Sequence, residues 1–362
     1  FFIILAVSVS LKPAEYYLEK KWIYPEIRWI GRCVTQGNTA ISMHGESFVL
    51  AGEEPSQLLF LPVASENVVL RSTYDPDQPD TIVYRAGQDY ILNSSEGHIR
   101  RTPNSRIPDY SQHPWYGKTG FAKHLDSLVS NKPYFVYLDY RTEKGCDLSA
   151  PVLEGPDQRR VLSKFTDNAT FSIVVYGDSI CFGAEASKPE LNFVARWMTS
   201  LKSRYPKTVF QCHNVSRSGM NSADGVASLS AEVLNLAPDL VLIGFGMNDY
   251  NTPLEDFKRN LQTMGLEISQ ISGAEIIFLS AFPANPDWYH FKANRRMPEL
   301  ARATREVAHE LRAGYAGVFE TWEKVLSRKD FPSLLMNDLN HPNDFGHWLY
   351  FIACNSFSWM PN

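Results

Sequence analysis

The chain has 362 residues, and its 35 lysines and arginines against 40 aspartates and glutamates give a formal net charge of −5. This length exceeds one average domain and predicts two, while the slightly acidic balance argues against a broad nucleic-acid surface. Five cysteines are too few for a disulfide scaffold. No apolar run approaches the roughly 18 residues of a membrane-spanning helix.

The sequence opens on an apolar segment, from Phe1 to Val7, without a methionine. One interpretation is the end of the hydrophobic region of a signal peptide. The other is a buried first strand that continues to Leu11. Both interpretations stay open, and we expect an extracytoplasmic protein, secreted or periplasmic.

Residues 1–165 have the pattern of an all-β domain, since short runs of β-branched and aromatic residues alternate with turn-forming segments. The clearest predicted strand spans residues 132–141, and a short helix is predicted near residues 121–129. Short strands with frequent turns are typical of a sandwich or jelly roll. The other predicted strands lie at residues 47–50, 57–61, 68–70, 81–84 and 90–92.

Residues 166–362 have a different period. Compact apolar runs, typical of strands buried on both faces, alternate with segments whose apolar residues recur at helical spacing. This alternation predicts a parallel α/β sheet flanked by helices. The sequence therefore predicts a β-sandwich over residues 1–165 and an α/β domain over residues 166–362. The predicted strands of the second domain lie at residues 171–176, from 209, 240–245 and 274–282.

Four polar segments stand where loops of the second domain are predicted, three of them directly after strands. Ligands of parallel sheets bind at the carboxyl ends of the strands. Alone, the first segment, Gly-Asp-Ser at 177–179, is typical of a turn with an N-cap serine. The other three are Asn-Val-Ser-Arg-Ser-Gly at 214–219, Gly-Phe-Gly-Met-Asn-Asp at 244–249, and Asp-Leu-Asn-His-Pro-Asn at 338–343. The four together, in this order, are much more specific than any one of them.

These four segments resemble the SGNH, or GDSL-type, hydrolase superfamily over about residues 170–362. The resemblance implies a flavodoxin-like α/β fold with Ser179 as nucleophile, His341 as base, and Asp338, three residues earlier, as the acid of the triad. It also implies an oxyanion hole formed by the backbone N–H groups of Ser179 and Gly219 and by the side-chain amide of Asn248.

The chemistry that the resemblance implies is acyl transfer. A serine hydroxyl needs an adjacent base, and His341 would take the proton of Ser179. Asp338 would bond the other ring nitrogen and stabilise the imidazolium. Ile180 stands where the GDSL signature has leucine, and this conservative apolar change leaves these roles in place.

Other residues near these segments are expected to be structural. His347 belongs to a second Asp-x-x-His and is expected to begin the last helix rather than act as base. Asp178 and Asp249 are expected to accept backbone N–H groups, and Cys181 is expected to fill the core. Neither the cysteines nor the histidines have metal-ligand spacing, so we predict no metal and no cofactor.

Trp288 and Tyr289 follow the fourth strand of the second domain and are candidate substrate contacts. A β-sandwich followed by an SGNH domain resembles the architecture of some two-domain carbohydrate esterases, among them acetylxylan esterases. We therefore predict a serine esterase that removes O-acetyl groups from a poly- or oligosaccharide. Two alternatives stay open: an esterase or lysophospholipase on lipid or other small acyl esters, and an O-acyltransferase or glycan-binding protein on the same fold.

Overall fold

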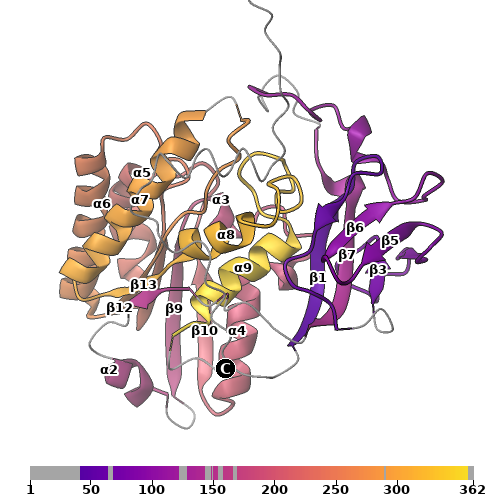
Figure 1. The fold of residues 1–362 in the computed structure, drawn as a ribbon. Coiled ribbons are helices and arrows are strands. Elements are labelled where there is room, and N and C mark those ends of the chain that lie inside the picture. Colours follow the sequence, from indigo (N-terminus) through magenta and orange to yellow (C-terminus); the bar gives the residue numbers. More distant parts are fainter. Residues whose placement is uncertain are drawn as a thin grey trace, which may run out of the picture.

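The computed structural model describes residues 41–63, 68–121, 129–142, 148, 150–153, 158–165, 169–288 and 291–357. Figure 1 shows two parts side by side, a group of N-terminal strands in indigo and magenta and a helix-covered sheet formed by the rest of the chain. The apolar segment at residues 1–7 and most of the helix predicted near residues 121–129 lie outside the described residues.

The N-terminal part contains two antiparallel sheets, one with the strand order β1-β7-β3-β4 and one with the order β2-β6-β5. The all-β prediction for this part is confirmed, and its description as a jelly roll stays a prediction. The strands are β1 (Ile41–Val49), β2 (Ser56–Gln57), β3 (Val69–Arg71), β4 (Val83–Tyr84), β5 (Tyr90–Asn93), β6 (His98–Arg101) and β7 (Phe135–Thr142).

The strand β7 begins three residues later than its pattern predicts. Residues 132–134 form a 3-10 turn instead, because Pro133 has no N–H to offer to a strand ladder. From Phe135 onward the strand pairs with both β1 and β3. Tyr137 and Leu138 point to opposite faces and are both buried. β7 is therefore a central strand with a core on each side.

The second part is a six-stranded sheet with the order β10-β9-β11-β12-β13-β8. The first five strands are parallel, which confirms the α/β prediction, and β8 joins β13 antiparallel at one edge. β8 precedes the predicted domain boundary at residue 165, so the chain enters this sheet earlier than its composition indicates. The strands are β8 (Val152–Leu153), β9 (Thr170–Gly177), β10 (Val209–Asn214), β11 (Leu240–Gly244), β12 (Glu275–Leu279) and β13 (Gly314–Ala316).

Helices cover both faces of this sheet. α5, α6 and α7 pack against one another on one side, and α4, α8 and α9 do so on the other. Their apolar residues recur at helical spacing, as with Trp197 and Leu201 of α4, which are both buried. The helices are α2 (Gln158–Ser163), α3 (Ser179–Phe182), α4 (Phe193–Arg204), α5 (Ser222–Glu232), α6 (Leu254–Glu267), α7 (Phe291–Glu310), α8 (Val318–Leu326) and α9 (Asp344–Cys354).

One buried apolar cluster joins the two parts, since it includes Phe48 and Leu138 of the N-terminal sheets as well as Trp197. α9 lies against β1, as Figure 1 shows. A buried ion pair also crosses the boundary, with Nζ of Lys329 2.8 Å from Oε1 of Glu46. The two parts therefore share a core, which fixes the loops of the second part against the strands of the first.

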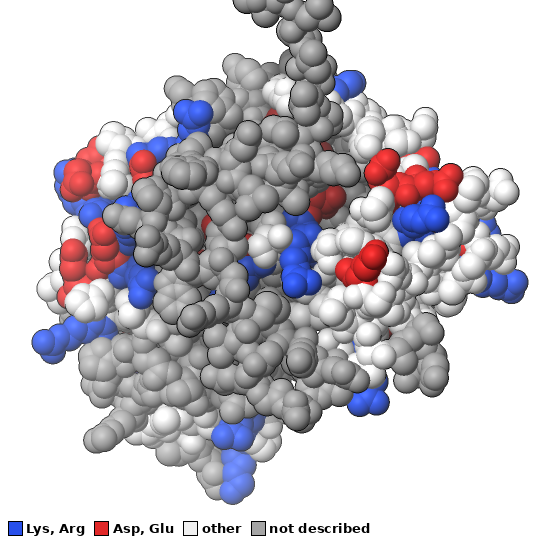
Figure 2. All heavy atoms as spheres, in the orientation of Figure 1, with Lys and Arg blue, Asp and Glu red and all other residues white. Residues whose placement is uncertain are grey.

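Charged side chains of both signs are interspersed on the face that Figure 2 shows. Several charged residues pair with neighbours, such as Arg100 with Glu53 at 3.1 Å. A surface of mixed charge steers a charged ligand only weakly. In the described part of the chain, no helix is both long enough and apolar enough to cross a membrane.

Candidate active site

Ser179 stands at the carboxyl end of β9, in the turn that leads into α3. Asp178 caps this short helix by accepting the backbone N–H of Ile180 at 2.9 Å. Gly177 is required before it, because a Cβ there would lie 2.3 Å from the carbonyl oxygen of Gly244 on the neighbouring strand β11. The close approach of two strands therefore explains the Gly-Asp-Ser sequence and presents the serine at the edge of the sheet.

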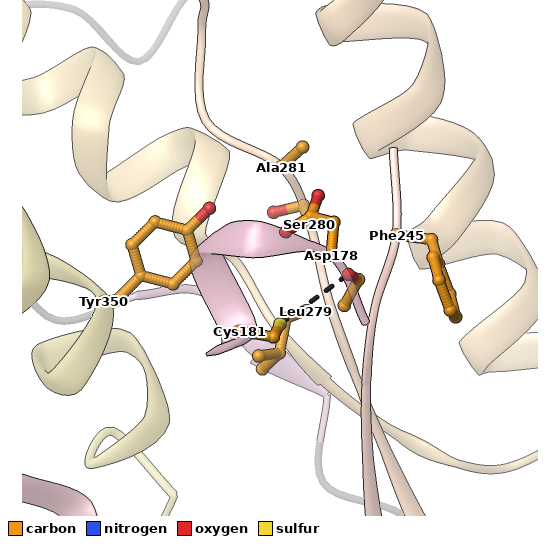
Figure 3. Close-up of a pocket in the computed structure, with 8 residues that line it drawn as sticks. Asp178, Cys181, Phe245, Leu279, Ser280, Ala281 and Tyr350 are labelled. Carbon is orange, nitrogen blue, oxygen red and sulfur yellow. Dashed lines mark hydrogen bonds between the residues drawn. The ribbon is translucent and has the colours of Figure 1, made fainter. Parts of the chain in front are cut away.

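A small cavity of about 10 Å³ lies beneath this turn and is shown in Figure 3. Its volume is that of a single water molecule. Cys181 is buried on its wall, with Sγ 3.6 Å from the carbonyl oxygen of Gly244. Burial raises the pKa of this thiol well above its usual value, so Cys181 is a neutral core residue, as predicted. The cavity is lined by Asp178, Cys181, Gly244, Phe245, Leu279, Ser280, Ala281 and Tyr350.

His341 comes from the far end of the chain to contact Ser179, and its Nε2 lies 2.8 Å from the hydroxyl oxygen. Two hydrogen bonds hold its backbone. The N–H of His341 donates to Oδ1 of Asn337 at 2.9 Å, and its carbonyl oxygen accepts from the N–H of Met336 at 2.9 Å. The hydroxyl proton can therefore pass directly to the imidazole.

His347, the second histidine of an Asp-x-x-His pair, lies elsewhere. It is fully buried in the first turns of α9, and its Nε2 donates to the carbonyl oxygen of Ala184 at 3.0 Å. Burial lowers the pKa of His347 to about 4, so the ring is neutral at neutral pH. The structural role predicted for this residue is confirmed.

The carboxyl group of Asp338 is hydrogen-bonded to residues other than His341. Its Oδ1 accepts from Nδ2 of Asn131 at 3.1 Å, and its Oδ2 accepts from the hydroxyl of Tyr110 at 3.4 Å. Nδ2 of Asn285 donates to the main-chain oxygen of Asp338 at 2.7 Å. The expected hydrogen bond between the carboxyl group of Asp338 and Nδ1 of His341 is not formed in this structure.

Nδ1 of His341 is buried and has no hydrogen-bond partner among the residues that the structure describes. Oε1 of Glu185 lies 3.9 Å away, an ion-pair distance rather than a hydrogen bond. Glu185 follows α3 in a left-handed conformation, with φ of 66°, and its side chain is 37% exposed. An exposed carboxylate at this distance contributes little because solvent screens it.

Two buried carboxyl groups stand close to the Ser–His pair in the sequence. Asp178 directly precedes Ser179, and Asp338 precedes His341 by three residues. Burial raises the pKa of Asp178 to about 7, although hydrogen bonds from backbone N–H groups favour the ionised form and lower it. Burial likewise raises the pKa of Asp338 to about 7, and the hydrogen bonds from Asn131 and Tyr110 oppose this shift. Both carboxyl groups therefore titrate near neutral pH.

The two other candidates for the oxyanion hole lie in neighbouring loops. Gly219 is exposed with φ of 80°, and a Cβ there would meet no atom within 4 Å. Asn248 donates its side-chain amide to the carbonyl oxygen of Met220 at 2.9 Å. Asp249 is buried and accepts the backbone N–H of Ser222 at 3.0 Å. These bonds tie the loop after β11 to the loop after β10, and they confirm that Asp178 and Asp249 are acceptors for backbone N–H groups.

Trp288 is half-buried and packs with Trp115, Phe121 and Leu339. Its ring makes an edge contact with Tyr250 at a centroid distance of 6.1 Å. The N-terminal part thus supplies aromatic residues beside the loop that carries His341. Tyr289, the second candidate substrate contact, lies outside the described residues.

Four residues of this site belong to no motif of the sequence: Tyr110, Asn131, Glu185 and Asn285. Tyr110 and Asn131 are more than 200 positions before Asp338. No local pattern indicates a contact over such a separation, so only the fold could identify these residues.

The parallel sheet carries a Ser–His pair at hydrogen-bond distance at the carboxyl end of its strands, an arrangement typical of serine hydrolases. Residues 175–349 match the model of the GDSL-like lipase/acylhydrolase family. The chain therefore contains a GDSL-like domain, which confirms the SGNH resemblance and supports an esterase.

Two solved structures have folds similar to that of this chain, at low sequence identity. Axe2, an acetylxylan esterase from Geobacillus stearothermophilus, is 22% identical, with a TM-score of 0.47 over 55% of this chain and 99% of that one. LAE5, an alpha/beta hydrolase from the metagenome of Lake Arreo, Spain, is 21% identical, with a TM-score of 0.45 over 53% of this chain and 95% of that one. At these identities and TM-scores, neither likeness indicates a substrate. No curated protein sequence matches the chain.

Proposed function

We propose that the protein is a serine esterase that removes O-acetyl groups from a carbohydrate through an acyl-enzyme intermediate. The observation that carries this proposal is the 2.8 Å contact between the hydroxyl oxygen of Ser179 and Nε2 of His341. A nucleophile and base at hydrogen-bond distance, in a chain with a GDSL-like domain, fit acyl transfer.

In the proposed reaction the hydroxyl oxygen of Ser179 attacks the ester carbonyl carbon, and its proton passes to Nε2 of His341. The negative charge on the carbonyl oxygen is stabilised by the N–H groups of Ser179 and Gly219 and by the amide of Asn248. The bond between the acyl carbon and the sugar oxygen then breaks, and His341 gives its proton to that oxygen, which leaves as a hydroxyl group. Water repeats these steps on the acyl-serine and releases acetate.

Asp338 is proposed as the carboxylate that supports His341 during these proton transfers. It precedes His341 by three residues in the same loop and is only 3% exposed. A buried Nδ1 without an acceptor costs free energy, and this cost rises when the ring becomes charged. Catalytic hydrogen bonds that are long or absent in a free enzyme often form in the substrate complex, so we propose that this one forms there.

A carbohydrate substrate is supported by the N-terminal part and by the polar surroundings of the site. An antiparallel β domain precedes the GDSL-like domain, an arrangement that resembles two-domain carbohydrate esterases. The segment before Gly219 is exposed and polar, with Arg217 and Ser218. Trp288 is half-buried near the loop of His341 and offers an aromatic surface for a sugar ring.

Acetate release from a panel of acetylated oligosaccharides, compared with hydrolysis of p-nitrophenyl esters of increasing chain length, tests this proposal. We expect acetylated sugars and p-nitrophenyl acetate to be hydrolysed, and the folded Ser179→Ala variant to be inactive on both. Turnover by Ser179→Ala at the wild-type rate would overturn the esterase mechanism. Activity on p-nitrophenyl acetate without acetate release from any sugar would overturn only the carbohydrate assignment.

An esterase acting on lipid or other longer acyl esters is the second candidate. The observation in its favour is Phe182, a large apolar side chain that is 59% exposed and stands three residues after Ser179. An exposed aromatic near a nucleophile can receive an acyl chain. Preference for octanoate over acetate in the same ester panel would favour this candidate.

A further inference from the structure

The segment that carries the catalytic histidine lies against the N-terminal sheets. The hydroxyl of Ser47 on β1 donates to the carbonyl oxygen of Ser333, and the N–H of Val49 donates to the hydroxyl of Ser333 at 3.2 Å. Lys329, at the start of this segment, is buried against Glu46 of the same strand. The first part of the segment at 329–343 is thus bonded to residues more than 280 positions earlier.

Among the described residues, Asn131 of the N-terminal part makes several hydrogen bonds to this segment. It is fully buried, and its backbone N–H donates to the carbonyl oxygen of Met336 at 2.9 Å. Its side-chain amide donates to the carbonyl oxygen of Leu335 at 2.8 Å and to Oδ1 of Asp338 at 3.1 Å. Met336 in turn donates to the carbonyl oxygen of His341. Two hydrogen bonds therefore connect Asn131 with the backbone of the catalytic base.

Tyr110 approaches the same carboxyl group from another side. Its hydroxyl lies 3.4 Å from Oδ2 of Asp338, and its ring is 5% exposed. The ring packs against Met336 and makes an edge contact with Tyr134 at 5.5 Å. Its backbone N–H is bonded to the carbonyl oxygen of Leu50 at 2.9 Å, which anchors it to the end of β1.

We infer that Asn131 and Tyr110 are positioning residues of the esterase site: they hold the loop of Asp338 and His341 so that the imidazole meets Ser179, and they hydrogen-bond the carboxyl group of Asp338. This inference rests on the proposed function. It assigns the N-terminal part a positioning role in catalysis, because two donors to the proposed acid of the triad come from outside the GDSL-like domain.

The charge of Asp338 depends on these donors. Hydrogen bonds to a carboxylate favour its ionised form, whereas burial and nearby negative charges favour the neutral form. Asp330 and Asp287 are the acidic groups that raise the pKa of Asp338 together with burial, and Asn131 and Tyr110 lower it. Loss of a donor therefore raises the pKa of Asp338 and moves the onset of activity to higher pH.

Tyr110→Phe tests the inference, because it removes only the hydroxyl and keeps the ring. We expect kcat for p-nitrophenyl acetate at pH 7 to fall by about tenfold to a hundredfold, as for loss of a hydrogen bond to a charged group. KM should stay unchanged, and the acid limb of the pH–rate profile should move to higher pH. Asn131→Ala should show the same pattern with a larger loss.

Tyr140→Phe is the matched control, since Tyr140 is a buried tyrosine of the same part whose hydroxyl donates to Glu46 at 2.6 Å and does not contact Asp338. It should alter thermal stability without moving the pH–rate profile. If Tyr110→Phe leaves both kcat and the acid limb unchanged, the inference is overturned. If Asn131→Ala fails to fold, the result with Tyr110→Phe still decides whether the positioning role holds.

Labelling of Ser179 by a fluorophosphonate separates this inference from the proposed function. The reagent needs only an activated serine. Slower labelling of Tyr110→Phe than of Tyr140→Phe supports the positioning role, even if the wild-type protein hydrolyses none of the esters and the proposed substrate fails. Equal labelling rates of the two variants across the pH range would count against the positioning role alone.

Discussion

The side-chain amide of Asn248 donates to the main-chain oxygen of Met220 at 2.9 Å, and this bond joins the loops that follow β11 and β10. Gly219 immediately precedes Met220, so the same bond places the two candidate donors of the oxyanion hole in adjoining loops. The amide has a second N–H, which can point at the substrate. One side chain thus connects the two loops and has a second N–H for the proposed oxyanion hole.

Replacing Asn248 should therefore affect turnover more than stability. We expect Asn248→Ala to lower kcat by about a hundred- to a thousandfold, because a preorganised donor to the oxyanion is lost. The matched control is Asn192→Ala at the N-cap of α4, which should cost about 1 kcal/mol of stability and leave kcat unchanged. Similar kcat values for the two variants would exclude Asn248 from the oxyanion hole.

The carboxylate that supports His341 can be identified by comparing two variants. Asp338→Asn should lower kcat by at least about a hundredfold, since an amide cannot stabilise the imidazolium. Glu185→Gln should change kcat by less than about fivefold, because its carboxylate is 37% exposed and 3.9 Å from Nδ1. The reverse order of effects would assign the role to Glu185.

The same Asp338→Asn variant should gain stability relative to the wild type as the pH rises. The pKa of Asp338 is raised from 3.8 to about 7 by burial. Its contribution to stability is therefore fully present below pH 3.8 and is lost as the pH rises through 7. Urea unfolding at pH 4 and pH 8 should show the difference growing by up to about 4 kcal/mol in favour of the variant.

Asp75→Asn is the control for that comparison, because a hydrogen bond from Lys188 lowers the pKa of Asp75. The difference in stability between Asp75→Asn and the wild type should shift in favour of the wild type as the pH rises. If Asp338→Asn and the wild type show parallel pH dependence, the carboxyl group of Asp338 is ionised without cost in the folded protein, and the predicted gain is wrong.

His347 should make the protein sensitive to acid. Burial lowers its pKa from 6.5 to about 4, so the stability it contributes is present above pH 6.5 and is lost as the pH falls through 4. His347→Gln keeps a donor for the carbonyl oxygen of Ala184 but does not titrate. Between pH 7 and pH 4, unfolding experiments should show the wild type losing about 3 kcal/mol more than this variant.

Two glycines of the site should differ in their tolerance of alanine. Gly177→Ala places a Cβ 2.3 Å from the carbonyl oxygen of Gly244 and should prevent normal folding. Gly219→Ala meets no atom, and only its φ of 80° is unfavourable, so it should cost about 1–2 kcal/mol. Circular dichroism and thermal unfolding of the two variants would check this order, and an equally stable Gly177→Ala would contradict it.

Much of the second part could be predicted from sequence because its determinants are local. Buried strands have continuous apolar runs, and each catalytic segment follows a strand or stands in one loop, so the order of the segments along the chain is informative. Several antiparallel strands are short, and neither β6 of the first part nor β8 at the edge of the second sheet was predicted. Strands of only two to four residues are too short for an alternation of apolar and polar residues to be recognised in the sequence.

Asp338 shows where the prediction from the sequence was incomplete. Its spacing from His341 indicated a hydrogen bond between the two side chains, yet the carboxyl group is bonded to Asn131 and Tyr110. Both donors come from the N-terminal part, which carries no motif. Which groups bond this carboxyl group depends on how the N-terminal sheets pack against the second part. The spacing of residues within one loop does not encode that packing.

Residue type, order and period were enough to predict the class of fold, the candidate pair Ser179 and His341, and the separation of β structure from α/β structure. What holds Asp338, and how the N-terminal sheets contact the loop of His341, became visible only in the folded chain. Such contacts join residues up to 286 positions apart. They form because a shared apolar core brings the two parts together, and hydrogen bonds then select the partners.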